Sequence, residues 1–192
     1  MRTQFNEMVS NLKKPGQDIL DSWTPTKASA AHMLTGLCDE YFEFSESVVN
    51  AVNYLVETEN EKIAGTQYAL HIVEEAGDAF FYIQGLVEDL DLPKIEFTPS
   101  SEYLGHPGGD SMLKVITLVK RHLYYNKELP LNELHTALQA LAHLMATVVE
   151  ETTECTVEDI MEANMTKLMK GRYKQGYSDT AANKREDKEE GQ

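Results

Sequence analysis

The chain has 192 residues, of which 42% are hydrophobic and 26% are charged, a composition that suits one globular domain with a sizeable core. Its net charge of −15 disfavours general binding to nucleic acids or membranes, because their negative charge would repel it. Two cysteines cannot build a disulfide framework, and no apolar run is long enough for a membrane span or a signal sequence. We therefore expect a soluble, cytoplasmic protein with a single domain over residues 1–192.

Helical patterns follow one another along the chain, and no strand pattern competes with them. In chain order, the expected helices cover residues 3–13, 18–23, 27–56, 63–90, 111–125, 131–151 and 156–170. Residues 94–110 hold two prolines and three glycines and are expected to form an internal loop, and residues 186–192 a frayed tail. The four long helices make two hairpins and predict an all-α fold with a core like that of a four-helix bundle.

The two helices of the first hairpin each carry a pair of carboxylates at positions i and i+3. The pairs are Glu40 with Glu43, and Glu75 with Asp78. At about 100° per residue, both pairs lie at matching offsets beside the apolar stripes of their helices, so we expect them to share one groove. The stripes comprise Leu34, Leu37, Tyr41, Phe44, Val48, Val52 and Leu55 on the first helix, and Ile72, Ala76, Ala79, Ile83, Leu86 and Leu90 on the second.

Four carboxylates in a partly dry groove repel one another unless cations neutralise them. Oxygen ligands without histidine or thiolate favour Mg²⁺ or Mn²⁺ over zinc. A single acidic pair is more often a solvated face, but two matching pairs favour a metal site. Glu46 and Glu74 lie opposite the stripes and are expected to face solvent. A di-iron centre is disfavoured, because no glutamate has a histidine three residues later.

The second hairpin lacks such acidic pairs, so its expected role is to cover the apolar stripes of the first. Its expected core residues are Leu113, Ile116, Leu134, Leu138, Leu141 and Met145. We therefore expect one acidic metal cluster per chain.

Three segments carry motifs in a recognisable order. They are Gly36-Leu-Cys-Asp-Glu40-Tyr-Phe-Glu43, Glu74-Glu75-Ala-Gly-Asp78-Ala-Phe-Phe-Tyr82, and Glu162-Ala-Asn164-Met-Thr-Lys167-Leu-Met-Lys-Gly-Arg172-Tyr173. The first two resemble the ExxE and ExxD motifs of the all-α nucleoside triphosphate pyrophosphohydrolases, a superfamily that includes MazG-like enzymes, dimeric dUTPases and phosphoribosyl-ATP pyrophosphohydrolases. The third is similar to the ending of MazG-like members, notably phage-encoded ones.

The resemblance implies a Mg²⁺-dependent hydrolase, with Mn²⁺ as a substitute, that converts a nucleoside triphosphate to a monophosphate and pyrophosphate. Water would attack the α-phosphorus. The implied metal-binding and catalytic residues are Glu40, Glu43, Glu75 and Asp78, and the candidates for binding the nucleotide are Asn164, Lys167 and Arg172. The family also favours a homo-oligomer, with a dimer preferred. The alternative is an acidic helical binding or scaffold protein without turnover, and pyrophosphate release from nucleotides separates the two.

Overall fold

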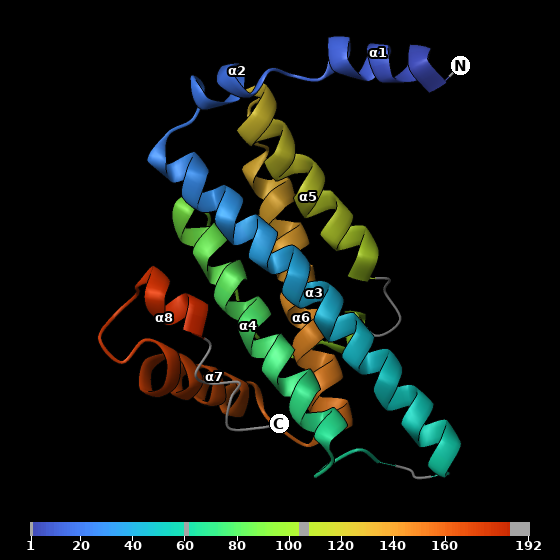
Figure 1. Cartoon of the computed structure of the whole chain (residues 1–192). Coiled ribbons are helices and arrows are strands. Elements are labelled where there is room, and N and C mark those ends of the chain that lie inside the picture. Colours follow the sequence, from blue (N-terminus) through green and yellow to red (C-terminus); the bar gives the residue numbers. More distant parts are fainter. Residues whose placement is uncertain (1, 60–61, 104–107, 185–192) are drawn as a thin grey trace.

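The computed structural model describes residues 2–59, 62–103 and 108–184, and over these residues the fold is all-α, as predicted (Figure 1). Apart from the helices there is an isolated bridge between Lys174 and Gly176. The elements in chain order are α1 (Arg2–Leu12), α2 (Gly16–Leu20), α3 (Pro25–Thr58), α4 (Gln67–Asp89), the 3₁₀ turn η1 (Ser101–Tyr103), α5 (Gly108–Tyr125), α6 (Leu131–Thr153), α7 (Val157–Met165), the π-helix η2 (Thr166–Arg172) and α8 (Asp179–Lys184).

Both helices of the first hairpin begin at a threonine whose side chain caps the first turn. The Thr24 side chain accepts a hydrogen bond from the backbone of Lys27 and starts α3, as predicted. Helix α4 begins at Gln67, four residues later than predicted, because Thr66 caps it and Gly65 adopts a positive φ of 76° just before. The 34-residue α3 therefore runs alongside a shorter α4.

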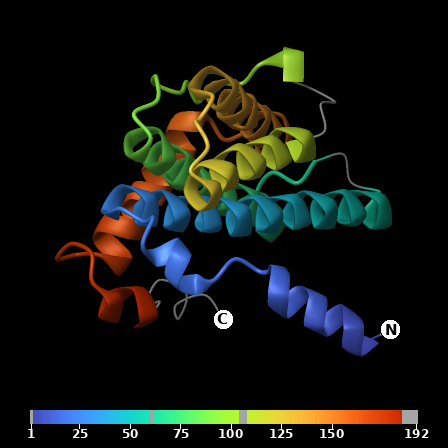
Figure 2. The same ribbon diagram turned by 90° about the horizontal axis from the view of Figure 1, so that it is seen from above.

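Helices α3, α4, α5 and α6 pack into the expected bundle. Helix α4 contacts both α3 and α6, and α5 contacts α3 and α6, so each hairpin covers the other (Figures 1 and 2). The largest fully buried side chains are Leu37, Ile63, Ile72, Ile83, Leu86, Ile95, Met112, Leu123, Leu134, Leu138, Leu141 and Met145. The core thus lies between the hairpins and holds the α3–α4 pair in place.

Two predicted core positions are wrong. Leu113 is 62% exposed, because the buried stripe of α5 passes through Met112 and Val115 instead. Val52 is 53% exposed, because alternate steps of three and four residues along α3 place Ala51 in the buried position. Both errors are shifts of one residue around a helix, which move a side chain by about 100°.

The loop between the hairpins lies along α6. The backbone N–H of Glu96 donates to the Gln139 side chain at 3.0 Å, and that of Ser100 to the Thr147 hydroxyl at 2.8 Å. Ile95 is also buried. Of the predicted loop of residues 94–110, the described part up to Tyr103 holds no helix apart from the 3₁₀ turn η1, and residues 108–110 belong to α5 instead.

The C-terminal segment packs against α4 on the side away from α5 (Figure 1). Helix α7 starts with a capping box between Thr156 and Asp159, which confirms the predicted cap. The predicted end near Lys170, with Gly171 as cap, is not observed, because the chain continues as η2 to Arg172. The predicted frayed tail lies outside the described residues. Among the helices that the structure describes, none is long and apolar enough to cross a membrane.

Candidate metal centre and adjoining cavities

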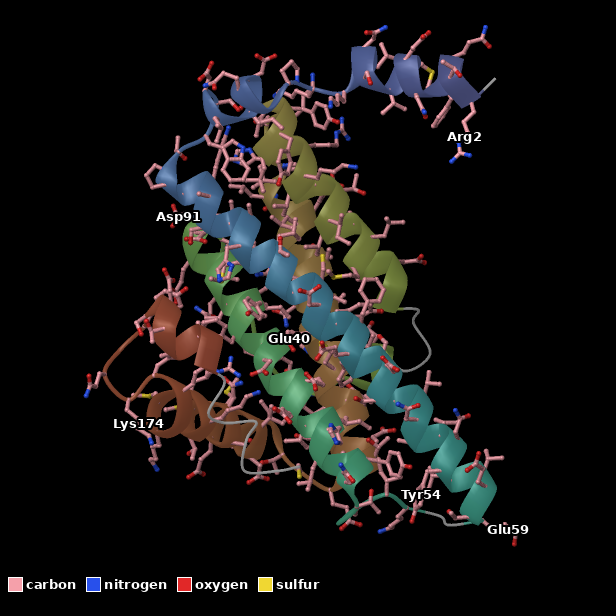
Figure 3. The ribbon with its side chains drawn as sticks, viewed as in Figure 1. Arg2, Glu40, Tyr54, Glu59, Asp91 and Lys174 are labelled. Carbon is pink, nitrogen blue, oxygen red and sulfur yellow. The ribbon has the colours of Figure 1, made fainter. Side chains whose placement is uncertain are left out.

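Helices α3 and α4 bring three of the predicted ligands together. Carboxylate oxygens of Glu40, Glu43 and Glu75 lie within 4.8 Å of one another, a spacing that one metal ion could bridge. Glu43 is exposed, Glu40 half-buried and Glu75 only 8% exposed, so the group spans the edge of the α3–α4 interface. Figure 3 shows Glu40 midway along α3. We call these three residues the acidic cluster.

The acidic cluster is too crowded for all its carboxylates to be ionised. Burial, the negative charge of Asp78 and a hydrogen bond with Glu75 raise the pKa of Glu40 to about 8. Burial also raises the pKa of Glu75, together with the charges of neighbouring carboxylates. At neutral pH, one proton therefore substitutes for a cation between Glu40 and Glu75, and a divalent ion would relieve the same repulsion.

The fourth predicted ligand, Asp78, lies beside the acidic cluster with both oxygens engaged. Asn164 donates to one oxygen at 2.5 Å, and the Lys167 ammonium donates to the other at 2.5 Å. Each oxygen retains a second lone pair, so metal binding by Asp78 is compatible with both bonds, and its role as a ligand stays a prediction. Asn164 and Lys167 are predicted to bind nucleotide; in the structure both donate hydrogen bonds to the Asp78 carboxylate, and their contact with a nucleotide stays a prediction.

Glu74 faces solvent only in part, whereas the prediction placed it fully on the solvent side. Its carboxylate accepts a hydrogen bond from Lys167 at 2.7 Å, and its side chain is 37% exposed. The reason is that α7 and η2 cover this side of α4, which helical periodicity alone does not reveal. Glu46 is exposed on α3, as predicted.

Lys167 on η2 forms ion pairs with Glu74 and Asp78 on α4. Burial alone would lower its pKa, but the charges and hydrogen bonds of Asp78 and Glu74 outweigh that effect and raise the pKa overall. The side chains of Lys167 and Asp78 are each 16% exposed. Lys167 is therefore charged and committed to two carboxylates.

A small polar cavity of about 140 Å³ opens beside the acidic cluster. It is lined by Gly36, Asp39, Glu40, Glu43, Asp78, Tyr82 and Arg172. Arg172, predicted to bind nucleotide, thus faces the carboxylates from the end of η2. It adds a positive charge to a lining that otherwise carries the carboxylates of Asp39, Glu40, Glu43 and Asp78.

A larger cavity of about 490 Å³ adjoins the small one, and Glu40, Asp78, Tyr82 and Arg172 line both. Its remaining walls are mainly apolar and aromatic: His32, Met33, Phe81, Leu168, Tyr173, Tyr177 and Ala182. The ring centroids of Tyr173 and Tyr177 are 5.5 Å apart, and the ring centroids of Phe81 and Tyr82 are 5.3 Å apart. We call this space the aromatic cavity.

Sequence reasoning did not assign a role to these aromatic residues, although Tyr82 and Tyr173 belong to the quoted motifs. Gly36 in the first motif also indicates the position of the Tyr82 ring. A Cβ atom there would lie 2.2 Å from the Tyr82 ring, so only glycine lets the ring lie against α3. The Tyr82 ring thereby forms a wall between the two cavities.

Two further features are less suited to a phosphorylated ligand. A third cavity of about 480 Å³ lies beyond Met33 and Phe81, but its lining includes Glu88 and Asp89 and, among the residues that the structure describes, no lysine or arginine. A second possible metal group consists of His71, Glu74 and Glu75. Because Glu74 is bonded to Lys167, a cation there would have to compete with an ammonium group.

No protein-family model, curated protein or solved structure matches the chain.

Proposed function

We propose that the protein is a divalent-metal-dependent nucleoside triphosphate pyrophosphohydrolase. The observation that carries this proposal is the acidic cluster of Glu40, Glu43 and Glu75 at the mouth of a cavity that also contains Arg172. Carboxylates that could bind a metal ion, an arginine that could bind phosphate and a cavity with aromatic walls thus adjoin one another. The motif resemblance supports the same reaction class.

The residues of the acidic cluster fit a hard divalent cation. All the donors are carboxylate oxygens, the ligand type that Mg²⁺ and Mn²⁺ prefer. Burial and then the negative charge of Asp78 raise the pKa of Glu40, and a bound cation would favour its ionised form instead. When bound, the cation would offset the charge of a triphosphate and activate water for attack on phosphorus.

The side chains around the acidic cluster would bind and orient the substrate. Arg172, at the junction of the two cavities, can donate several hydrogen bonds to phosphate oxygens as negative charge develops on them. Tyr82, Tyr173 and Tyr177 offer ring faces for stacking a nucleobase, an interaction that tolerates different bases. The triphosphate would then lie over the acidic cluster, and the nucleoside in the aromatic cavity.

Asn164 and Lys167 would act as positioning residues. Their bonds hold Asp78 at the wall of the polar cavity, and Lys167 also limits the negative charge that the site presents to an incoming triphosphate. Neither residue lines the polar or the aromatic cavity. Their effect on the substrate would therefore be transmitted through Asp78.

The test is hydrolysis of a panel of ribo- and deoxyribonucleoside triphosphates with Mg²⁺ or Mn²⁺. The expected products are the monophosphate and pyrophosphate, and EDTA should abolish their formation. Glu43→Gln should remove most turnover while the helical circular dichroism stays unchanged, and Glu46→Gln, an exposed change on the same helix, is the matched control. Phosphate as the first product would refute the reaction. Metal binding without turnover of any nucleotide would instead indicate a non-catalytic binding protein.

A further inference from the structure

Helix α1 is amphipathic but has no partner within the described chain. All its residues are exposed, and it projects from the bundle (Figures 1 and 2). The spacing i, i+3, i+4, i+7 places four apolar side chains on one face: Phe5, Met8, Val9 and Leu12, which are 59%, 46%, 43% and 75% exposed. Arg2 and Lys13 flank this face on one side, since both lie at about 60–80° from Phe5. An isolated helix of 11 residues is marginal in water, so this face needs a partner.

The C-terminal half of α3 presents a second uncovered apolar face. Phe42, Val49 and Val56 recur every seven residues and are 63%, 57% and 75% exposed. Glu46 and Glu57 are both exposed and lie at about 40–60° from Phe42, along one flank of that face. We call this surface the α3 face. Like α1, it combines exposed apolar side chains with two charged residues along one flank, which are acidic here and basic on α1.

The charges of the two surfaces match in spacing and in handedness. Arg2 and Lys13 are 11 residues apart, and so are Glu46 and Glu57, which corresponds to about 16 Å along each helix. In both helices the charges flank the apolar stripe on the same side when viewed from the N-terminus. Two such helices bring these flanks together when they pack antiparallel, as the corresponding flanks do in antiparallel coiled coils.

A helical α1 cannot reach the α3 face of its own chain. The segment after α1 is fixed near the start of α3, because the Lys14 ammonium donates to the Tyr124 carbonyl oxygen at 2.6 Å and the Trp23 ring packs on the Tyr124 ring. Val49 lies 24 residues beyond Pro25, or about 36 Å along α3, whereas α1 extends only about 17 Å from Lys13. The partner must come from another molecule.

We propose that α1 of one copy packs antiparallel on the α3 face of a second copy, and that the exchange is reciprocal in a two-fold symmetric dimer. Lys13 then faces Glu46, and Arg2 faces Glu57, while Leu12 and Phe5 cover the regions of Val49 and Val56. Reciprocal exchange uses the same pair of surfaces twice and covers the apolar face of α1 together with the part of the α3 face around Val49 and Val56, so the assembly closes at two copies. This inference does not depend on the proposed enzymatic activity.

Charge reversal on the full-length chain gives a direct test by analytical ultracentrifugation. The arm variant Arg2→Glu/Lys13→Glu and the acceptor variant Glu46→Lys/Glu57→Lys each place like charges opposite one another in a homodimer. Each should raise the dimer dissociation constant by about tenfold or more. Mixed together, the two variants restore opposite charges at both contacts, and a heterodimer should form with nearly the affinity of the wild type.

Controls separate this contact from a general effect of charge. Lys120→Glu/Arg121→Glu makes the same charge change as the arm variant on an exposed part of α5 and should leave the wild-type dimer intact. Unchanged circular dichroism establishes that the variants fold. The inference is overturned if the wild type stays monomeric, including the case in which α1 binds anionic vesicles instead. It is also overturned if the dimer survives both reversals, or if the mixture stays monomeric.

Discussion

Among single residues, Glu40 links protonation to stability. Its pKa rises from 4.5 to about 8 on folding, first because of burial and then because of Asp78 and Glu75. Between these two pH values the folded state holds a proton that the unfolded chain has released, so folding becomes less favourable as the pH rises. We expect the metal-free protein to lose stability progressively from about pH 5 to about pH 8 for this reason.

Thermal unfolding in EDTA across this pH range tests that expectation, with Glu40→Gln as the comparison. The variant cannot ionise at this position, so its melting temperature should fall less as the pH rises. At pH 8 its melting temperature should exceed that of the wild type by at least a few degrees, since each kcal/mol of unfolding free energy shifts the melting temperature by about 2–4 °C. Mg²⁺ should raise the melting temperature of the wild type more than that of the variant. Parallel pH profiles for the two proteins would contradict the argument.

Glu74 and Glu75 are adjacent in sequence but have different partners. Glu75 belongs to the acidic cluster and is buried, whereas Glu74 is bonded to Lys167 at the edge of α4. Glu75→Gln should therefore weaken Mn²⁺ binding by about tenfold or more, and Glu74→Gln should leave it within about threefold. Calorimetric titration with Mn²⁺ measures both. Equal losses would place the ion at the alternative group of His71, Glu74 and Glu75.

At the scale of elements, the contact between α3 and α4 depends on Gly36. A methyl group there would collide with the Tyr82 ring, so Gly36→Ala should destabilise the protein by about 1–3 kcal/mol, the usual cost of overpacking. It should also weaken nucleotide binding, because the ring would leave the cavity wall. Gly109→Ala is the control, since a Cβ atom there meets nothing within 4 Å. Urea unfolding distinguishes the two, and equal stabilities would show that Tyr82 moves without cost.

The attachment of η2 to α4 depends on Lys167. Lys167→Met keeps much of the side-chain volume but leaves the nearly buried Asp78 without its cation. We therefore expect the free energy of unfolding, measured in EDTA, to fall by about 1–3 kcal/mol. One positive charge beside the acidic cluster is removed, so Mn²⁺ should bind more tightly than in the wild type. Lys170→Met, an exposed change on the same element, should alter neither quantity. Weaker Mn²⁺ binding in Lys167→Met would mean that the lysine positions Asp78 as a ligand.

For the whole molecule, stability comes from the core that the two hairpins share. Leu138 on α6 is fully buried, and Leu138→Ala should lower the free energy of unfolding by about 2–5 kcal/mol. The loss has two parts: the removed methyl groups no longer leave water on folding, and a cavity stays behind in the core. Leu113 on α5 is 62% exposed, so Leu113→Ala should change stability by about 0.5 kcal/mol or less. Guanidinium unfolding of both variants provides the comparison. A large loss in Leu113→Ala would show that this face is covered in solution.

The sequence alone determined the features that depend on local interactions. Helical periodicity and caps at Thr24 and Thr156 are encoded within a few residues, so the order of the helices from α1 to α7 could be predicted. The π-helical form of η2 and the short helix α8 were not predicted. The spacing of Glu40 with Glu43, and the position of Glu75 beside its stripe, follow from helix geometry in the same way. These local rules predicted the bundle and the acidic cluster.

Only the tertiary structure decided which faces are covered and by what. Asp78 and Glu74 share Lys167 from a segment about 90 residues away, and no local pattern contains that pairing. The exposure of Leu113 depends on which face of α5 turns toward its neighbours, and the structure buries Met112 and Val115 instead. Burial and charge pairing are properties of contacts between elements, so they are determined only once the helices have packed.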